Sequence, residues 1–153
     1  KIAKSIANSE NIFVLGRGIN FPVALEGALK LKEVSGIHAE GIPAAEMKHG
    51  PISLITEQTP VFFIAPKDKT YDKLINNIEE IKSRGGKTIV ITTENSSDIE
   101  KITDEVICIP DAGDYLSPVC SVIPFQLLSY FIAIEKNMPV DRPRNLAKTV
   151  TVE

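Results

Sequence analysis

The chain has few cysteines and no tryptophan. Its 153 residues include only two cysteines, Cys108 and Cys120, and these lie twelve positions apart in the sequence. Disulfide frameworks and metal sites use more cysteines at close, repeated spacings. We therefore expect a cytoplasmic protein with two buried thiols and no bound metal.

The sequence has no cluster of positive charge. The sequence has 17 Lys and Arg against 20 Asp and Glu, a formal net charge of -3, and the basic residues are scattered. Nucleic-acid binding needs clustered Lys and Arg to neutralise phosphates. No apolar run approaches the length of a membrane span, and no basic-then-apolar leader opens the chain. The sequence therefore predicts neither a nucleic-acid partner nor a membrane partner.

What the chain has is the composition of one compact domain. It is 43% hydrophobic and 24% charged, a balance typical of a folded domain of this length. Because the first residue is Lys1, we expect a piece of a longer protein.

Strand-like and helix-like segments alternate along the sequence. Residues 11–15, 60–65, 88–92 and 105–109 are short, β-branched and almost continuously apolar, as strands buried on both faces are. Helical spacing follows at 71–84 and 121–136, and the second helix is apolar almost all round, which predicts deep burial. The expected fold is α/β, a three-layer αβα sandwich with a central parallel sheet and ligands near the carboxyl ends of the strands.

A glycine-rich turn, Gly16-Arg17-Gly18, follows the first predicted strand. It lacks the third glycine of a dinucleotide fingerprint, because Phe21 stands there. We therefore expect a tight strand-to-helix turn and no nucleotide cofactor.

Three charged residues share one face of the next helix. Glu26, Lys30 and Glu33 fall within an arc of roughly 60° at about 100° per residue. The spacing favours a surface ladder of ion pairs. Because Val23, Leu29 and Val34 flank the arc, the alternative is a polar notch in which Glu33 is a general base. His49 ends a short helical turn and could be a cap, and His38 is assigned to structure.

The carboxyl-terminal stretch fits neither a helix nor a strand period. Pro139 and Pro143 stop the preceding helix, and Lys148 then lies between Leu146-Ala147 and Thr149-Val150. A lysine that loses water in such surroundings is a candidate amine nucleophile.

Together these segments resemble one known family, the glucosamine-6-phosphate synthases, whose isomerase region is two sugar isomerase (SIS) domains in tandem. The matching segments are Leu15-Gly16-Arg17-Gly18, residues 24–33, His38-Ala39-Glu40, Lys48-His49-Gly50-Pro51 and residues 142–153. The tail is the most specific of them and the glycine turn the least. The resemblance implies that residues 1–153 are the second SIS domain, ending in a catalytic tail at 137–153.

The family's reaction converts fructose 6-phosphate and glutamine-derived ammonia into glucosamine 6-phosphate. By resemblance, Lys148 forms an imine with C2, Glu33 shuttles a proton from C1 to C2, His49 assists ring opening, and Lys30 stabilises the enolate-like charge. An imine acidifies the C1 proton, and a fixed carboxylate can carry it, so these roles are chemically sensible.

The resemblance also implies the surroundings of this site. Ala147 and Arg144 belong to a tail that covers the sugar, and no metal or organic cofactor is required. The expected partners are the sugar phosphates, the preceding SIS and glutaminase domains of the parent chain, and a second copy in a homodimer, because the counterpart of His49 reaches a neighbouring subunit.

One loop departs from the family's pattern. SIS domains that hold a sugar phosphate use a Ser/Thr-rich loop at a helix start, whereas this chain has residues 65–70, where Thr70 alone keeps a hydroxyl. Pro66 removes an N–H donor and Asp68 adds a repelling charge. We expect this half to be unable to cradle the phosphate, and the isolated piece to be inactive.

Two other functions remain open. A related SIS ketosamine-phosphate deglycase or deaminase can share the tail lysine. A non-catalytic SIS sensor would bind sugar phosphate without needing Glu33, His49 or Lys148, so their joint presence argues against it.

Overall fold

The computed structural model of the chain describes residues 1–93 and 96–146. Five strands form one sheet in the order β2-β1-β3-β4-β5, and every neighbouring pair is parallel. The strands are β1 (Asn11–Gly16), β2 (His38–Pro43), β3 (Pro60–Ile64), β4 (Lys87–Thr93) and β5 (Glu105–Ile109). The predicted parallel α/β fold is confirmed.

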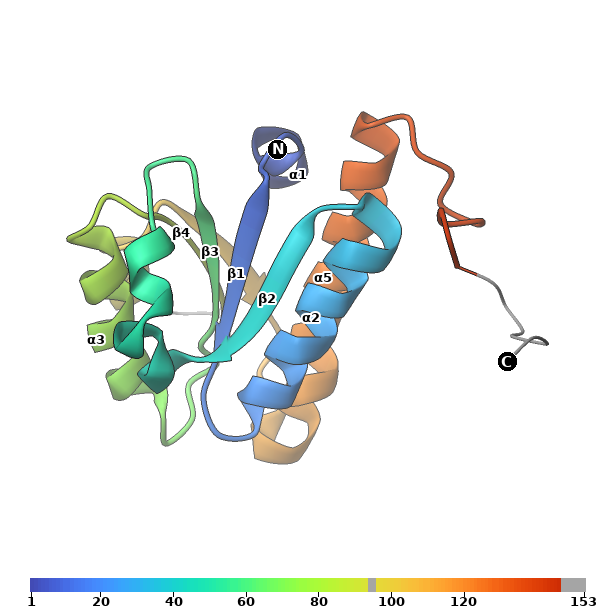
Figure 1. Cartoon of the computed structure of the whole chain (residues 1–153). Coiled ribbons are helices and arrows are strands. Elements are labelled where there is room, and N and C mark those ends of the chain that lie inside the picture. Colours follow the sequence, from blue (N-terminus) through green and yellow to red (C-terminus); the bar gives the residue numbers. More distant parts are fainter. Residues whose placement is uncertain (94–95, 147–153) are drawn as a thin grey trace, which may run out of the picture.

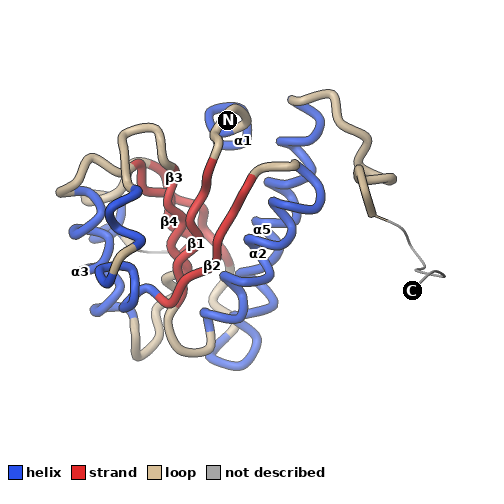
Figure 2. The backbone as a smooth tube through the Cα atoms, viewed as in Figure 1, coloured by secondary structure: helices blue, strands red, loops and turns tan. Residues whose placement is uncertain are grey.

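Helices cover both faces of the sheet (Figure 1). The α-helices are α1 (Ile2–Ile6), α2 (Asn20–Ser35), α3 (Tyr71–Lys82), α4 (Ser97–Glu100) and α5 (Gly113–Glu135), and two 3₁₀ turns are η1 (Ala44–His49) and η2 (Pro51–Leu54). Figure 2 shows the layers, with α2 and α5 together on one side of the strands and α3 on the other.

Alternate strand residues feed two separate cores. Phe62 and Ile64 of β3 pack with α1, α2 and α5, while Val61 and Phe63 pack with α3 and η1. Successive side chains of a strand point to opposite faces, so one continuous apolar strand supplies both layers.

The glycine turn after β1 is the tight turn that the sequence predicts. A side chain at Gly16 would come within 2.1 Å of the carbonyl oxygen of Asn20, and Gly18 has a φ of +57°. Only glycine fits such an approach, so the chain enters α2 directly after the strand.

The α5 helix departs from its prediction in two ways. It begins at Gly113, with Pro118 and Pro124 inside it, so it starts earlier than the predicted residue 121. It is not deeply buried all round: eight large apolar side chains along it are exposed, among them Tyr115, Val119 and Phe131. An apolar sequence does not reveal whether its own domain covers it.

By length and composition alone, α5 could also cross a membrane, contrary to the expectation from the apolar runs. Its buried side carries Phe125, Leu128 and Ile132 into the core beside the sheet. That packing is typical of a core helix in a globular domain.

The two thiols are not buried as expected. Cys108 is exposed and Cys120 is partly exposed. Cys108 lies on β5, which is an edge strand of the sheet, so its neighbours cover it on one side only.

The crossing of α2 and α5 predicts the effect of one substitution. Alanine normally stabilises a helix over glycine by about 0.5–1 kcal/mol. A methyl group at Gly27 would, however, lie 2.7–3.0 Å from ring atoms of the fully buried Phe125, and overpacking costs about 1–3 kcal/mol.

Gly27→Ala should therefore lower the free energy of unfolding by about 1 kcal/mol, measured by denaturant titration. In a Phe125→Leu background the same change should cost less. A Gly27→Ala protein as stable as the parent in both backgrounds would contradict this packing.

Candidate functional site

The three charged residues of α2 do lie together. Lys30 Nζ donates a hydrogen bond to Glu33 Oε2 at 2.6 Å and lies 3.5 Å from Glu26 Oε1. The side chain of Lys30 is 27% exposed and that of Glu33 is 30% exposed. The cluster is therefore half-buried. It is less exposed than the surface ladder and more exposed than the buried notch that the sequence left open as alternatives.

Electrostatics in this cluster favour a protonated Lys30. The hydrogen bond to Glu33 raises the pKa of Lys30 above its ordinary 10.5, burial opposes this, and the charges of Glu33 and Glu26 add to the rise. The cluster thus presents a carboxylate held by a firmly cationic amine, which suits proton transfer beside a developing negative charge.

The start of the tail lies at the same end of α2. Lys136, just after α5, donates from Nζ to the carbonyl oxygen of Ser35 at 2.8 Å, which ties the ends of the two helices together. In Figure 1 the chain leaves α5 at this end and then runs outward, away from α2. Arg144 is described and exposed, whereas Ala147 and Lys148 lie outside the described residues.

His49 lies elsewhere. It is the exposed last residue of η1, whose Met47 is buried in the core on the α3 side of the sheet. Glu33 belongs to α2, which packs on the opposite side. Within one chain the structure brings Lys30 and Glu33 together and separates them from His49.

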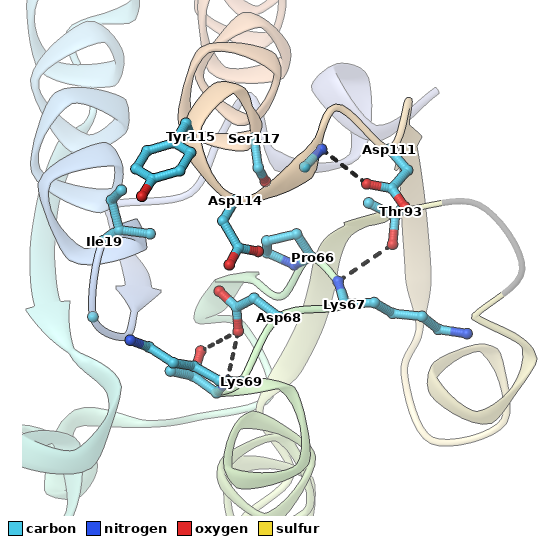
Figure 3. A pocket seen from close by; sticks show the side chains of 13 residues that line it. Ile19, Pro66, Lys67, Asp68, Lys69, Thr93, Asp111, Asp114, Tyr115 and Ser117 are labelled. Carbon is cyan, nitrogen blue, oxygen red and sulfur yellow. Dashed lines mark hydrogen bonds between the residues drawn. The ribbon is translucent and has the colours of Figure 1, made fainter.

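A pocket of about 250 Å³ opens at the carboxyl ends of the strands, where the topology places ligands. The loops after β1 and β3 meet there and lead to helices on opposite faces, so we call it the switch-point pocket. Its walls are Gly18 and Ile19, residues 66–70, Thr93 and the start of α5 (Figure 3). Asp114, Tyr115 and Ser117 were not predicted as site residues, because nothing in a sequence shows which loops meet.

One corner of the switch-point pocket is filled by its own carboxylate. Asp68 Oδ1 accepts hydrogen bonds from the Thr70 backbone N–H at 2.6 Å and the Thr70 hydroxyl at 2.7 Å. Asp68 Oδ2 accepts one from Asn20 Nδ2 at 2.9 Å. Donors at the start of α3 that an anion would use are thus engaged by Asp68.

Comparison with known proteins gives the class of this domain. Residues 5–136 match the SIS domain family, and this chain therefore belongs to it. The doubly wound parallel sheet and the pocket at its switch point agree with that class.

More particular similarities point to one kind of enzyme. The chain is 58% identical to glutamine–fructose-6-phosphate aminotransferase (isomerizing) of Chlorobaculum tepidum and 51% identical to that of Aquifex aeolicus, in both cases over 100% of this chain. It covers 25% and 26% of those proteins, so it spans about a quarter of the curated relatives it matches.

A solved structure agrees. The C-terminal domain of glucosamine-fructose-6-phosphate aminotransferase from Francisella tularensis superimposes with a TM-score of 0.84 at 39% identity. The match covers 92% of this chain and 40% of that one.

The geometry of the α2 cluster predicts how Lys30 titrates. Glu33→Gln should lower the pKa of Lys30, because it removes the closest hydrogen bond to a carboxylate. Glu26→Gln is the matched control and should lower it less, since that contact is longer. NMR titration of the Lys30 ε-methylene group measures both.

The sign for stability follows from the raised pKa. The contribution of Lys30 to the free energy of unfolding is complete at pH values below the pKa of Lys30 in the unfolded chain. It is lost as the pH rises through the higher pKa that Lys30 has in the folded protein. Equal shifts of the Lys30 pKa in the Glu33→Gln and Glu26→Gln variants would show that Glu33 is not the principal partner of Lys30.

Proposed function

We propose that this chain is the carboxyl-terminal SIS domain of an isomerising glutamine–fructose-6-phosphate aminotransferase. The parent enzyme would convert fructose 6-phosphate and ammonia from glutamine into glucosamine 6-phosphate. The observation that carries this proposal is the identity of 58% over the whole of this chain with an enzyme of that name.

Each proposed role belongs to a group with the matching chemistry. Lys148 forms an imine with C2 of the opened sugar and releases water. Ammonia then adds to C2 and displaces the Lys148 amine, which leaves a C2 imine of ammonia that acidifies the proton on C1. Glu33 takes that proton and returns it at C2, and Lys30, held 2.6 Å from Glu33, stabilises the negative charge that develops between the two steps.

The remaining roles lie on other parts of the chain. His49 assists ring opening, while Arg144 and Ala147 belong to the tail over the sugar. His49 and Glu33 lie on opposite sides of the sheet, so they serve different active sites of an assembled enzyme. That separation supports a homodimer in which His49 of one copy reaches the site of the other.

The phosphate of the substrate is held by another part of the parent chain, in our proposal the preceding SIS domain. Two features support this. The donors at the start of α3 already bind Asp68, and the Glu33 cluster lies at the far end of α2 from that corner. From Ile19 to Lys30 the rise along a helix is roughly 16 Å, too far for a single hexose phosphate to bridge.

The exposed apolar row of α5 supports a parent protein of several domains. Leu127, Tyr130, Phe131 and Ile134 lie about half exposed on consecutive turns of one helix. Contiguous apolar surface of this kind marks an interface. Three quarters of each curated relative lies outside the matched region and could supply the cover.

Trapping of the imine tests the central role. We expect borohydride to fix fructose 6-phosphate covalently to Lys148 in the parent enzyme, located by peptide mass spectrometry. Lys148→Arg should abolish labelling, while Lys136→Arg, on the same terminal stretch, should keep it. Labelling at any other lysine would refute the assignment.

Substitution of Asp68 tests the proposal that this domain does not bind the substrate phosphate. Asp68→Ala should lower the free energy of unfolding by about 1 kcal/mol, because it removes the side-chain acceptor at the start of α3. Inorganic phosphate should then raise the melting temperature of this variant more than that of the unsubstituted 153-residue chain, since phosphate can bind the freed donors.

Asp72→Ala, in the first turn of α3 but outside the pocket, is the control. Thermal unfolding in phosphate and in chloride at matched ionic strength gives the comparison. Equal stabilisation of the parent and the Asp68 variant by phosphate would show that Asp68 does not fill an anion site.

A further inference from the structure

The switch-point pocket has no task in the proposed reaction. The reactive groups lie on the outer end of α2 and on the tail, whereas this pocket lies at the beginning of α2. At about 250 Å³ it is smaller than the roughly 300–1,000 Å³ of sites for drug-sized ligands, and so it suits a molecule of a few carbons.

Carboxylates outnumber cations in the wall of the pocket, with Asp68, Asp111 and Asp114 against Lys67 and Lys69. Asp68 already occupies the donors at the start of α3, and Asp111 Oδ1 accepts the backbone N–H of Gly113 at the start of α5. Of the two lysines in the wall, Lys67 places its amine 5.9 Å from the ring centroid of Tyr71. In Figure 3 the Lys67 side chain extends away from the pocket.

Two carboxylates face each other across the interior. Figure 3 shows Asp68 and Asp114 pointing toward one another, and the Asp114 side chain makes no hydrogen bond or ion pair within residues 1–93 and 96–146. Facing carboxylates repel unless a cation lies between them. Among the described residues no group of three or more potential ligands could hold a metal ion, so an ammonium group is the better match.

A buried hydroxyl gives an independent indication of a ligand. Ser117 is 7% exposed, and its Oγ finds no hydrogen-bond partner among the described residues. Figure 3 shows this oxygen directed into the pocket. Buried polar atoms are seldom left unpaired, and a ligand hydroxyl could both donate to and accept from Ser117.

The mouth of the pocket is apolar. Tyr115 is 91% exposed and Ile19 is 51% exposed, and both line the pocket. An aromatic ring and an aliphatic side chain can cover the C–H faces of a carbon skeleton, while polar groups in the interior bind the polar groups of the same ligand.

We propose that the switch-point pocket binds a small polyhydroxylated amine without a phosphate, such as a free amino sugar. Its ammonium group lies between Asp68 and Asp114, a hydroxyl bonds to Ser117, and the carbon skeleton rests on Tyr115. This site does not depend on the proposed reaction.

Binding to the isotope-labelled 153-residue chain tests the proposal. The probes are glucosamine, glucose and fructose 6-phosphate, followed by amide NMR at slightly acidic pH. Glucosamine should shift resonances of Gly18, Gly113 and Ser117 and bind more tightly than glucose. Tighter binding of fructose 6-phosphate at the same residues, or no shift there with glucosamine, would overturn the proposal.

Matched variants separate the site from general effects. Asp114→Asn should weaken glucosamine binding about tenfold, the equivalent of one charged contact, while Asp72→Asn in the first turn of α3 should not. Ser117→Ala should weaken it. Ser121→Ala should not, because Ser121 lies outside the pocket, although it too is buried on α5 and its hydroxyl has no partner among residues 1–93 and 96–146. Equal affinities within either pair would contradict the assigned contacts.

Discussion

The ring of Phe125 packs against Gly27 where α2 and α5 lie together on one face of the sheet, and against Phe62 of β3 beneath them. The two rings meet edge to face with centroids 5.5 Å apart, and both are fully buried. The absent side chain at Gly27 lets α2 lie close to α5. This fixes which face of α2 is turned outward, and that face carries Glu26, Lys30 and Glu33.

From this packing follows a separation of sites within one small domain. The start of α2 borders the switch-point pocket, and its end holds the Lys30–Glu33 pair beside the first residues of the tail. His49 lies across the sheet from both helices. We propose that a domain arranged in this way contributes groups to active sites that other domains or copies complete.

Local patterns predicted the central strands, because burial on both faces leaves an uninterrupted apolar run, as at 60–64 and 87–93. The edge strand β2 was harder to predict: exposed His38 and Glu40 interrupt its apolar residues, since it is covered on fewer sides. The spacing of Lys30 and Glu33 predicted their contact, because a helix fixes that geometry by itself.

The burial of Cys108 and of the exposed apolar row of α5 was predicted wrongly, since their exposure depends on neighbours that a local pattern does not specify. For the same reason the sequence does not show the hydrogen bonds of Asp68, nor that the Ser117 hydroxyl has no partner within the described part of the chain.

Turnover of the parent enzyme with changes at two glutamates of α2 tests the account most directly. Glu33→Gln should reduce conversion of fructose 6-phosphate about 100-fold or more, the usual loss for a missing general base, while leaving sugar binding intact. Glu26→Gln removes a carboxylate from the same cluster and should keep turnover near that of the parent. Equal losses in the two variants, or full turnover with Gln at position 33, would contradict the assignment of proton transfer to Glu33.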